Sequence, residues 1–219
     1  MYSVPLFVVF SLILALVLTD RDLRLPSLHM SAWFLPTALS ATVVACLWRM
    51  IFNDTGFLNS LILLSGGLKV GWLSSLPGAW VSIIAATLWW TIGWNVIIIY
   101  SARKKIPETL YDAAKVDGAG RMRTFLAVTA PGLKNVMLYV VKTQTLASFG
   151  LFAQPQLMTK GYPGRSTIPV ALHMYGVSFG STGDMLGLGA AMSVVTGLVI
   201  LLFSTVILAS FGIRKETGE

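Results

Sequence analysis

The chain has 219 residues, of which 55% are hydrophobic and only 11% are charged, and its mean hydropathy is +0.76. Soluble domains carry about 25% charged residues, so this composition excludes an ordinary water-soluble fold and favours a membrane-embedded helical bundle. Cys46 is the single cysteine, which excludes an internal disulfide, and its apolar surroundings predict a buried thiol. His29 and His173 stand apart from other ligand-type residues, so we expect no metal site.

Five apolar stretches predict membrane-spanning helices, each of which needs about 20 residues. They are residues 4–18, 30–52, 79–100, 133–153 and 185–211. The first stretch is short, but it lacks the basic start and the small-residue cleavage site of a signal peptide, so we predict a span or the second half of one. Pro36 and Pro155 are expected to bend or end helices. The expected fold is therefore all-α, a polytopic transmembrane helical bundle.

Lysine and arginine predict which loops face the cytoplasm. If the five spans alternate in direction, the loop at 102–134, the C-terminal tail and the turn after the first span share one side. These segments contain eleven of the sixteen basic residues, including Arg21, Arg24, Arg214 and Lys215. We therefore expect that side to be cytoplasmic and the N-terminus to be external. An external N-terminus predicts at least one more span upstream of Met1.

Small residues recur every four positions in the last predicted span, at Gly189, Ser193 and Gly197. Such a ridge allows a neighbouring helix to approach closely. Packing within this subunit and packing against a partner subunit are both consistent with the pattern.

A polar stretch, "YDAAKVDGAG" at residues 111–120, interrupts the apolar chain. Pro107 and Glu108 before it are typical of a helix start, because proline lacks a donor that would be unpaired there and glutamate complements the helix dipole. Gly118 permits a sharp turn into a second short helix. We therefore predict a helix–turn–helix on the cytoplasmic side.

The first of these two helices is expected to present small side chains on one face. Three- and four-residue spacing places Leu110, Ala113, Ala114 and Asp117 on that face. Composition alone permits two interpretations. The element is either an amphipathic loop lying on anionic headgroups or a rigid surface against which a partner protein packs.

The segment "IPETLYDAAKVDGAGRMRTFLAVTAPGL" resembles the EAA loop of ABC-importer permeases. The matching positions are Asp112, Ala113, Ala114, Asp117, Gly118, Ala119, Phe125 and Pro131. Asp112 departs from the family pattern, which usually has glutamate there, and its side chain is shorter by one methylene. The segments "LWRMIFNDTGFLNSLI", "LMTKGYPGRST" and "LTDRDLRLPSLHMSAWFLPTAL" are similar to sugar permeases of the MalF type, so the resemblance covers nearly the whole chain.

The resemblance implies one permease domain over residues 1–219, which lacks the first of six core spans, with residues 102–134 as the cytoplasmic coupling loop. It implies that a cytoplasmic ATPase dimer, with ATP and magnesium, contacts this loop, while this chain binds no cofactor and is not an enzyme. It also implies a second permease subunit, which forms a heterodimer with this chain, and an external solute-binding protein. The expected location is the bacterial or archaeal inner membrane, in contact with lipid and without nucleic acid.

Polar and aromatic residues inside spans predict the solute pathway, because they are costly in lipid unless they line a cavity or find partners. The candidates are Asn95, Lys142, Gln144, Ser148, Phe149 and Phe152. Amides and aromatic rings suit the hydroxyls and flat C–H faces of a sugar. Lys142 is consistent with snorkelling to the interface, with lining the cavity or with a subunit ion pair.

The expected function is the permease subunit of an ATP-driven importer of a sugar or oligosaccharide. Glycerol phosphate and polyamine are alternatives by the same mechanism. The spans offer almost no acidic residue for a polyamine, whereas Lys142 or Arg165 would suit a phosphorylated solute. An integral membrane lipid enzyme would need a surface cluster of His, Asp or Glu, which the sequence lacks, and the long resemblance disfavours a simple scaffold. "GYPGRS" lacks the spacing of a nucleotide-binding loop, so ATP hydrolysis must belong to a partner.

Overall fold

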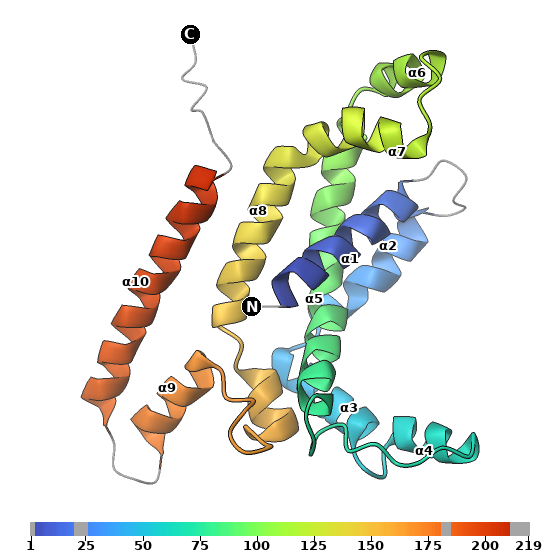
Figure 1. Ribbon diagram of the computed structural model, residues 1–219. Helices are drawn as coiled ribbons and strands as arrows, with labels where there is room; N and C mark the ends of the chain where they lie inside the picture. Colours follow the sequence, from blue (N-terminus) through green and yellow to red (C-terminus); the bar gives the residue numbers. More distant parts are fainter. Residues whose placement is uncertain (1–2, 20–25, 181–184, 211–219) are drawn as a thin grey trace. The chain divides into compact units, whose positions relative to one another are not determined.

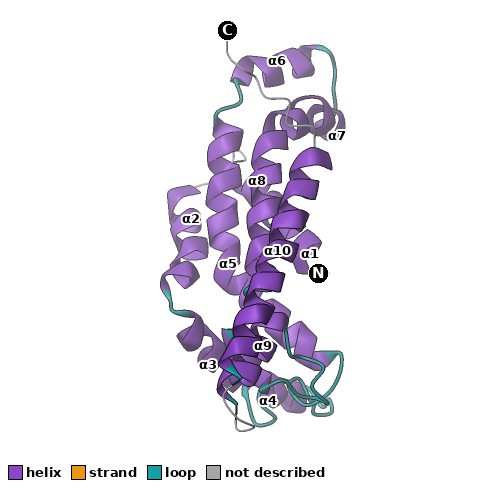
Figure 2. Cartoon of the chain, turned by 90° about the vertical axis from the view of Figure 1, so that its left-hand side faces the viewer, coloured by secondary structure: helices purple, strands orange, loops and turns teal. Residues whose placement is uncertain are grey.

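The computed structural model describes residues 3–19, 26–180 and 185–210, and over these ranges it contains helices and loops but no strand (Figures 1 and 2). The helices are α1 Ser3–Leu18, α2 Pro26–Phe34, α3 Ala41–Phe52, α4 Phe57–Leu64, α5 Gly78–Lys104, α6 Glu108–Val116, α7 Arg121–Thr124, α8 Ala130–Phe149, α9 Val170–Phe179 and α10 Leu186–Ser210. A 3-10 turn, Leu35–Ala38, and two π turns, Phe125–Thr129 and Pro155–Thr159, lie between them. Arg21, Arg24, Asp184, Arg214 and Lys215 lie outside the described residues.

Among the described residues, three helices are long and apolar enough to cross a membrane unaided, namely Gly78–Lys104, Arg121–Phe149 and Leu186–Ile207. A fourth candidate is the pair Leu28–Ala38 and Ala41–Leu64, whose axes differ by 99°. α1 is apolar but has only 16 residues, fewer than the roughly 20 that a perpendicular span requires. The structure therefore supports three or four spans where the sequence predicted five.

The largest difference concerns residues 30–52, which were predicted to form one span. Pro36 is buried in the 3-10 turn, where its missing N–H and fixed φ oppose a continuous α-helix. Ser40 then starts α3 as an N-cap, and its Oγ accepts a hydrogen bond from the Val43 N–H at 3.3 Å. The predicted span is therefore divided into two helices, and the prediction that Pro36 bends or ends a helix is confirmed.

The contacts divide the chain into two compact units, each of which contains segments distant in the sequence. The first unit comprises Met1–Leu35, Ile92–Thr145 and Val206–Glu219, and the second comprises Pro36–Thr91 and Leu146–Thr205.

In the first unit, α2 and α5 approach so closely that their backbones touch. A Cβ at Gly93 would lie 2.1 Å from the Trp33 carbonyl oxygen, so this position requires glycine. Next to it, the rings of Phe34 and Trp94 stack with centroids 6.4 Å apart. Small residues at a crossing allow the close approach on which helix packing in membranes depends.

Aromatic side chains form much of the core of the second unit. Phe52 stacks on Trp48 with ring centroids 5.3 Å apart and lies 5.8 Å from Trp72. The buried amide of Asn59 holds the loop after α4, because its Oδ1 accepts from the Val70 N–H and its Nδ2 donates to the Val70 carbonyl, both at 3.0 Å. Cys46 on α3 is exposed, so the predicted burial of its thiol is wrong.

The small-residue ridge of α10 also lies in the second unit, and only part of it is covered. A Cβ at Gly189 would lie 1.8 Å from Ser178 Oγ on α9, and Ser193 Oγ lies 3.6 Å from Met174 Sδ. A Cβ at Gly197 would meet no described atom within 4 Å. The ridge therefore packs within this chain at Gly189 and Ser193 and is open at Gly197.

Candidate functional site

α6 is a short helix with a defined start and a defined end. Pro107 occupies its N-cap position and Glu108 its first turn, as the sequence predicts. At the other end, the Gly118 N–H donates to the Lys115 carbonyl at 3.0 Å and the Ala119 N–H donates to the Ala114 carbonyl at 2.9 Å. These two bonds form a Schellman motif, which places Gly118 at φ +68° in the left-handed region that favours glycine. The predicted turn at Gly118 is confirmed.

Tyr111 connects α6 to both neighbouring helices. Its hydroxyl oxygen lies 3.0 Å from Thr129 Oγ1, which is buried at the end of the π turn before α8. The Arg103 guanidinium, in the last turn of α5, lies 3.8 Å from the centroid of the same ring. The position of α6 is therefore linked to the end of α5 and to the start of α8.

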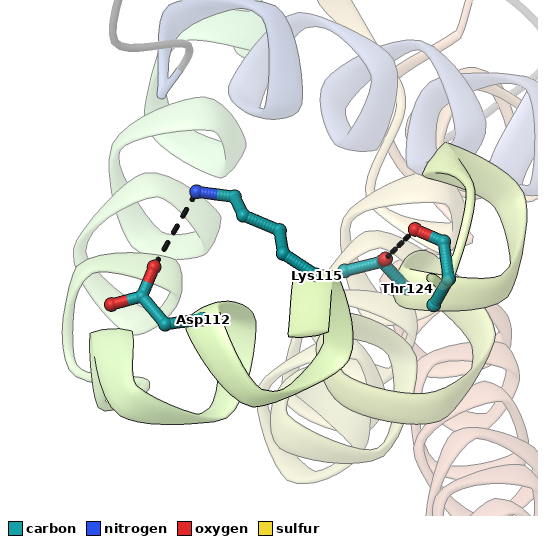
Figure 3. A network of polar contacts seen from close by, with 4 residues as sticks. Asp112, Lys115 and Thr124 are labelled. Atoms are coloured by element: carbon teal, nitrogen blue, oxygen red, sulfur yellow. Dashed lines mark hydrogen bonds and ion pairs between the residues drawn. The ribbon is translucent and has the colours of Figure 1, made fainter. Parts of the chain in front are cut away.

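The residues that match the EAA pattern on α6 differ in exposure. Ala113 is exposed with Leu110 and Asp117, whereas Ala114 is 8% exposed and faces the interior. Helical spacing still relates these four positions, and Ala114 lies at the buried edge of the group, so the shared face stays a prediction. Asp112 is exposed and pairs with Lys115 at 3.4 Å (Figure 3). This pair lies in water with both side chains more than 60% exposed, so it adds little stability.

Apolar side chains lie exposed on and beside α6 and α7. Val116 is 88% exposed, Met122 is 71% exposed and Leu126 is 62% exposed. Exposed apolar side chains on a loop that also carries the small Ala113 are typical of surfaces that bind a partner. Figure 1 shows α6 and α7 beyond the end of α5, in the same compact unit.

The return from the loop into α8 is tightly packed. Phe125 begins the π turn and Pro131 lies in the first turn of α8. A Cβ at Gly132 would lie 2.6 Å from Cδ1 of the buried Ile106, which immediately precedes the N-cap of α6. Ala119 accepts a hydrogen bond at its carbonyl from Thr124 Oγ1 at 3.3 Å, which fixes the turn between α6 and α7 (Figure 3). The loop is therefore a packed element and not a free linker.

The predicted solute residues divide between the two compact units. Asn95, Lys142 and Gln144 belong to the first unit, while Ser148, Phe149 and Phe152 belong to the second. Asn95 is 2% exposed, and its Nδ2 has no hydrogen-bond partner among the described residues. The rings of Phe149 and Phe203 lie 6.0 Å apart, and those of Phe152 and Tyr175 lie 5.2 Å apart. These two phenylalanines therefore have packing partners within their unit.

A family model for the inner membrane component of binding-protein-dependent transport systems matches residues 1–213. The chain belongs to this family. It is a membrane component of an ABC importer, that is, a permease.

Over the described residues, no group of three or more His, Cys, Asp or Glu side chains is placed to hold a metal ion.

Known relatives are longer than this permease. It is 33% identical over 209 residues to the probable ABC transporter permease protein YurN of Bacillus subtilis, covering 94% of this chain and 71% of YurN. It is also 33% identical over 181 residues to the lactose transport system permease protein LacF of Rhizobium radiobacter, covering 81% of this chain and 61% of LacF. The permease thus spans about two thirds of the length of these relatives.

The fold is also similar to that of a solved transporter. A chain of a bacterial ABC transporter involved in the import of the acidic polysaccharide alginate superposes with a TM-score of 0.81 at 19% identity. The similarity covers 98% of this permease and 73% of that chain. At this identity the likeness establishes the fold alone.

Sequence reasoning missed three residues that position the loop of this permease, namely Arg103, Tyr111 and Thr129. Their contacts join positions 8 and 18 residues apart along the chain that belong to different elements, so the periodicity of a single helix does not relate them. One signal was present in the sequence. Tyr111 is the single aromatic residue in the nine-residue helix "ETLYDAAKV", where small and polar residues predominate.

Proposed function

We propose that this permease forms, with a second permease subunit, the pathway for a sugar or oligosaccharide delivered by an external binding protein. The α6–α7 loop docks on a cytoplasmic ATPase dimer, which binds ATP and magnesium. The residues proposed for this contact are Asp112, Ala113, Ala114, Asp117, Gly118, Ala119, Phe125 and Pro131. In this assignment Asp112 and Ala113 touch the ATPase, whereas the buried Ala114 supports the helix from within.

The contacts of Tyr111 are the observation that best supports the coupling role. A docking element must transmit movement to the spans, and it does so only if it moves with them as one body. Tyr111 is held by Arg103 of α5 on one side and by Thr129 before α8 on the other. The exposed Val116 and Met122 supply apolar surface for the partner.

Two observations support a saccharide as the solute. LacF is a lactose transport permease by name, and it is one of the relatives at 33% identity. The buried amide of Asn95, which lacks a partner within the described residues, is a group that a sugar hydroxyl would satisfy. We assign Asn95, Lys142, Gln144, Ser148, Phe149 and Phe152 to the pathway on this basis.

A cavity in the second unit favours an anionic solute as the second candidate. It measures about 380 Å³, and its lining includes Lys160, Arg165 and His173. Lys160 and Arg165 adopt left-handed backbone conformations, at φ 52° and 65°. The Thr159 and Thr167 hydroxyls, 2.8 Å apart and buried, fix the loop that carries them. A phosphorylated or acidic solute would find cationic groups here, whereas a polyamine would be repelled.

ATP hydrolysis by the reconstituted transporter tests the solute assignment. The permease, its ATPase, the second subunit and the binding protein are placed in liposomes with lactose, maltose, arabino-oligosaccharide, glycerol 3-phosphate or spermidine. We expect a neutral saccharide to stimulate hydrolysis most. Stimulation by glycerol 3-phosphate with no response to any saccharide would favour the second candidate.

Labelling at Val116 tests the orientation of the loop. Val116→Cys is made in a Cys46→Ser background, because Cys46 is the single native thiol and is exposed. A membrane-impermeant maleimide should label this variant in inverted vesicles and not in intact cells. Labelling of intact cells would place the loop outside and contradict the ATPase-docking role. Lys69→Cys, in the loop after α4, is the control for the opposite side of the membrane, so it should be labelled in intact cells.

A further inference from the structure

The first unit contains a cavity of about 970 Å³ where the coupling loop meets the ends of two apolar helices. Leu16 and Leu18 of α1, Tyr100 of α5 and Ile106 form one part of its lining. The last turn of α5, α6, α7 and the π turn before α8 contribute further residues. Its volume falls within the range of small-molecule sites, about 300–1,000 Å³, and none of the proposed solute residues lines it.

Cationic side chains predominate in this cavity. The basic residues that line it are Arg103, Lys104, Lys115 and Arg121. Glu108 is the one carboxylate among the described residues of the lining. Asp112 partly neutralises Lys115 through the exposed 3.4 Å pair, but Asp112 itself does not line the cavity. The cavity therefore retains a positive field that favours an anionic ligand.

The geometry of Arg103 suits a phosphate. Its guanidinium carbon lies over the Tyr111 ring, 3.8 Å from the ring centroid, so the side chain is held in place by a cation–π contact. A guanidinium held by its face still presents N–H donors along its edge, in the planar arrangement that pairs with phosphate oxygens. Lys104 lies 5.1 Å from the centroid of the Tyr100 ring and adds a second cation at the end of α5.

The remaining lining indicates the source of the phosphate. Leu16, Leu18 and Ile106 supply apolar walls, which a free inorganic ion would not use. Tyr100 and Tyr111 are amphipathic rings of the kind enriched at the headgroup level of membranes. Basic pockets between membrane helices at this level are suited to acidic lipid headgroups.

We propose that this cavity binds the headgroup of an anionic phospholipid at the loop end of α5. Arg103, Lys104 and Arg121 contact the phosphate, and the leucines of α1 contact the glycerol and upper acyl region. The proposal goes beyond the transport function, because it does not depend on which solute is carried. It also explains why a loop that docks a soluble partner has basic side chains facing the spans.

Lipid binding to the assembled transporter tests the proposal. The complex is purified in a neutral detergent, stripped of lipid and titrated with phosphatidylglycerol, phosphatidylcholine or inorganic phosphate. Thermal shift and native mass spectrometry measure binding. We expect phosphatidylglycerol to bind and stabilise the complex at concentrations where the other two do not. Equal stabilisation by phosphatidylcholine, or binding of inorganic phosphate as tight as that of the lipid, would overturn the proposal.

Two double variants of equal charge locate the site. Lys104→Gln with Arg121→Gln removes two cations from the lining and leaves the Arg103–Tyr111 contact in place. Lys105→Gln with Arg123→Gln removes two exposed cations of the same segments that do not line the cavity. Because it lacks two interfacial cations, the first variant should bind phosphatidylglycerol roughly thirtyfold more weakly. The second should change affinity less than about threefold.

Equal losses in the two double variants would indicate diffuse attraction to the loop and would overturn the proposed site. Photocrosslinking covers the case in which the first variant does not fold. A photoactivatable phosphatidylglycerol bound to the unmodified complex should label peptides from residues 16–19 and 100–125. Labelling confined to other helices would count equally against the proposal.

Discussion

The hydroxyl oxygen of Tyr111 lies 3.0 Å from Oγ1 of Thr129 and joins α6 to the π turn that leads into α8. Arg103 stacks on the same ring at 3.8 Å, so one side chain contacts the segments before and after the loop. α6 is therefore held to both the end of α5 and the segment that leads into α8.

Tyr111→Phe should weaken coupling while preserving the loop. The variant keeps the ring under Arg103 but leaves the buried Thr129 hydroxyl without this partner, at a cost of about 1 kcal/mol. We expect the ATPase to copurify normally and solute-stimulated ATP hydrolysis to fall severalfold. Tyr139→Phe is the control, because Tyr139 on α8 is 51% exposed. An unchanged hydrolysis rate in Tyr111→Phe would show that the hydrogen bond has no role in transmission.

Gly118→Val should distort the turn after α6. The left-handed backbone at φ +68° costs a residue with a side chain about 1–2 kcal/mol, although a Cβ there would meet no described atom within 4 Å. We expect reduced ATPase copurification with normal amounts of permease in the membrane. Gly118→Asn should be milder, because asparagine tolerates this conformation.

Gly120→Val is the matched control for the Gly118 variants. A Cβ at Gly120 is equally unobstructed within the described residues, and its φ of −68° is ordinary. Should Gly120→Val impair copurification as strongly as Gly118→Val, the effect would lie in bulk at the interface and not in the turn.

The Asp112→Ala variant distinguishes a role of Asp112 in ATPase binding from a role in the stability of the complex. Asp112 and Lys115 are both more than 60% exposed, so loss of their pair should leave the melting temperature of the complex nearly unchanged. If Asp112 contacts the ATPase, the affinity of the complex for the ATPase should fall, and Asp112→Glu should retain it. Asp54→Ala, in the loop between α3 and α4, serves as the control. A fall in melting temperature with unchanged ATPase affinity would contradict the proposed contact.

Gly189→Val and Gly197→Val test the two halves of the ridge on α10. A Cβ at Gly189 would overlap Ser178 Oγ, so valine should force α9 and α10 apart and destabilise the permease by about 1–3 kcal/mol. Gly197→Val should leave the stability of the isolated chain unchanged. Reduced assembly with the second subunit in Gly197→Val alone would assign the open half of the ridge to that interface. The reverse pattern, with Gly197→Val less stable than Gly189→Val, would contradict the described packing.

Composition and periodicity predicted the helical class and three long apolar helices well, since lipid tolerates only segments whose backbone groups are paired internally. They failed at residues 30–52, where hydropathy is continuous but the backbone is not. Pro36 indicated a bend, but the angle of 99° between the two segments is known only from the structure. Cys46 was misplaced for a related reason, because an apolar residue on a membrane helix can face outward.

The sequence alone determined the family, the start of α6 at Pro107 and the turn at Gly118, because capping and left-handed backbone are properties of a few adjacent residues. Only the tertiary structure decided that Ala114 faces inward while Ala113 faces outward, and that Arg103, Tyr111 and Thr129 meet. It also decided that four basic residues of one loop region line a common cavity. These features depend on side-chain contacts between different helices. Such contacts are set by how the helices cross, which the local sequence does not determine.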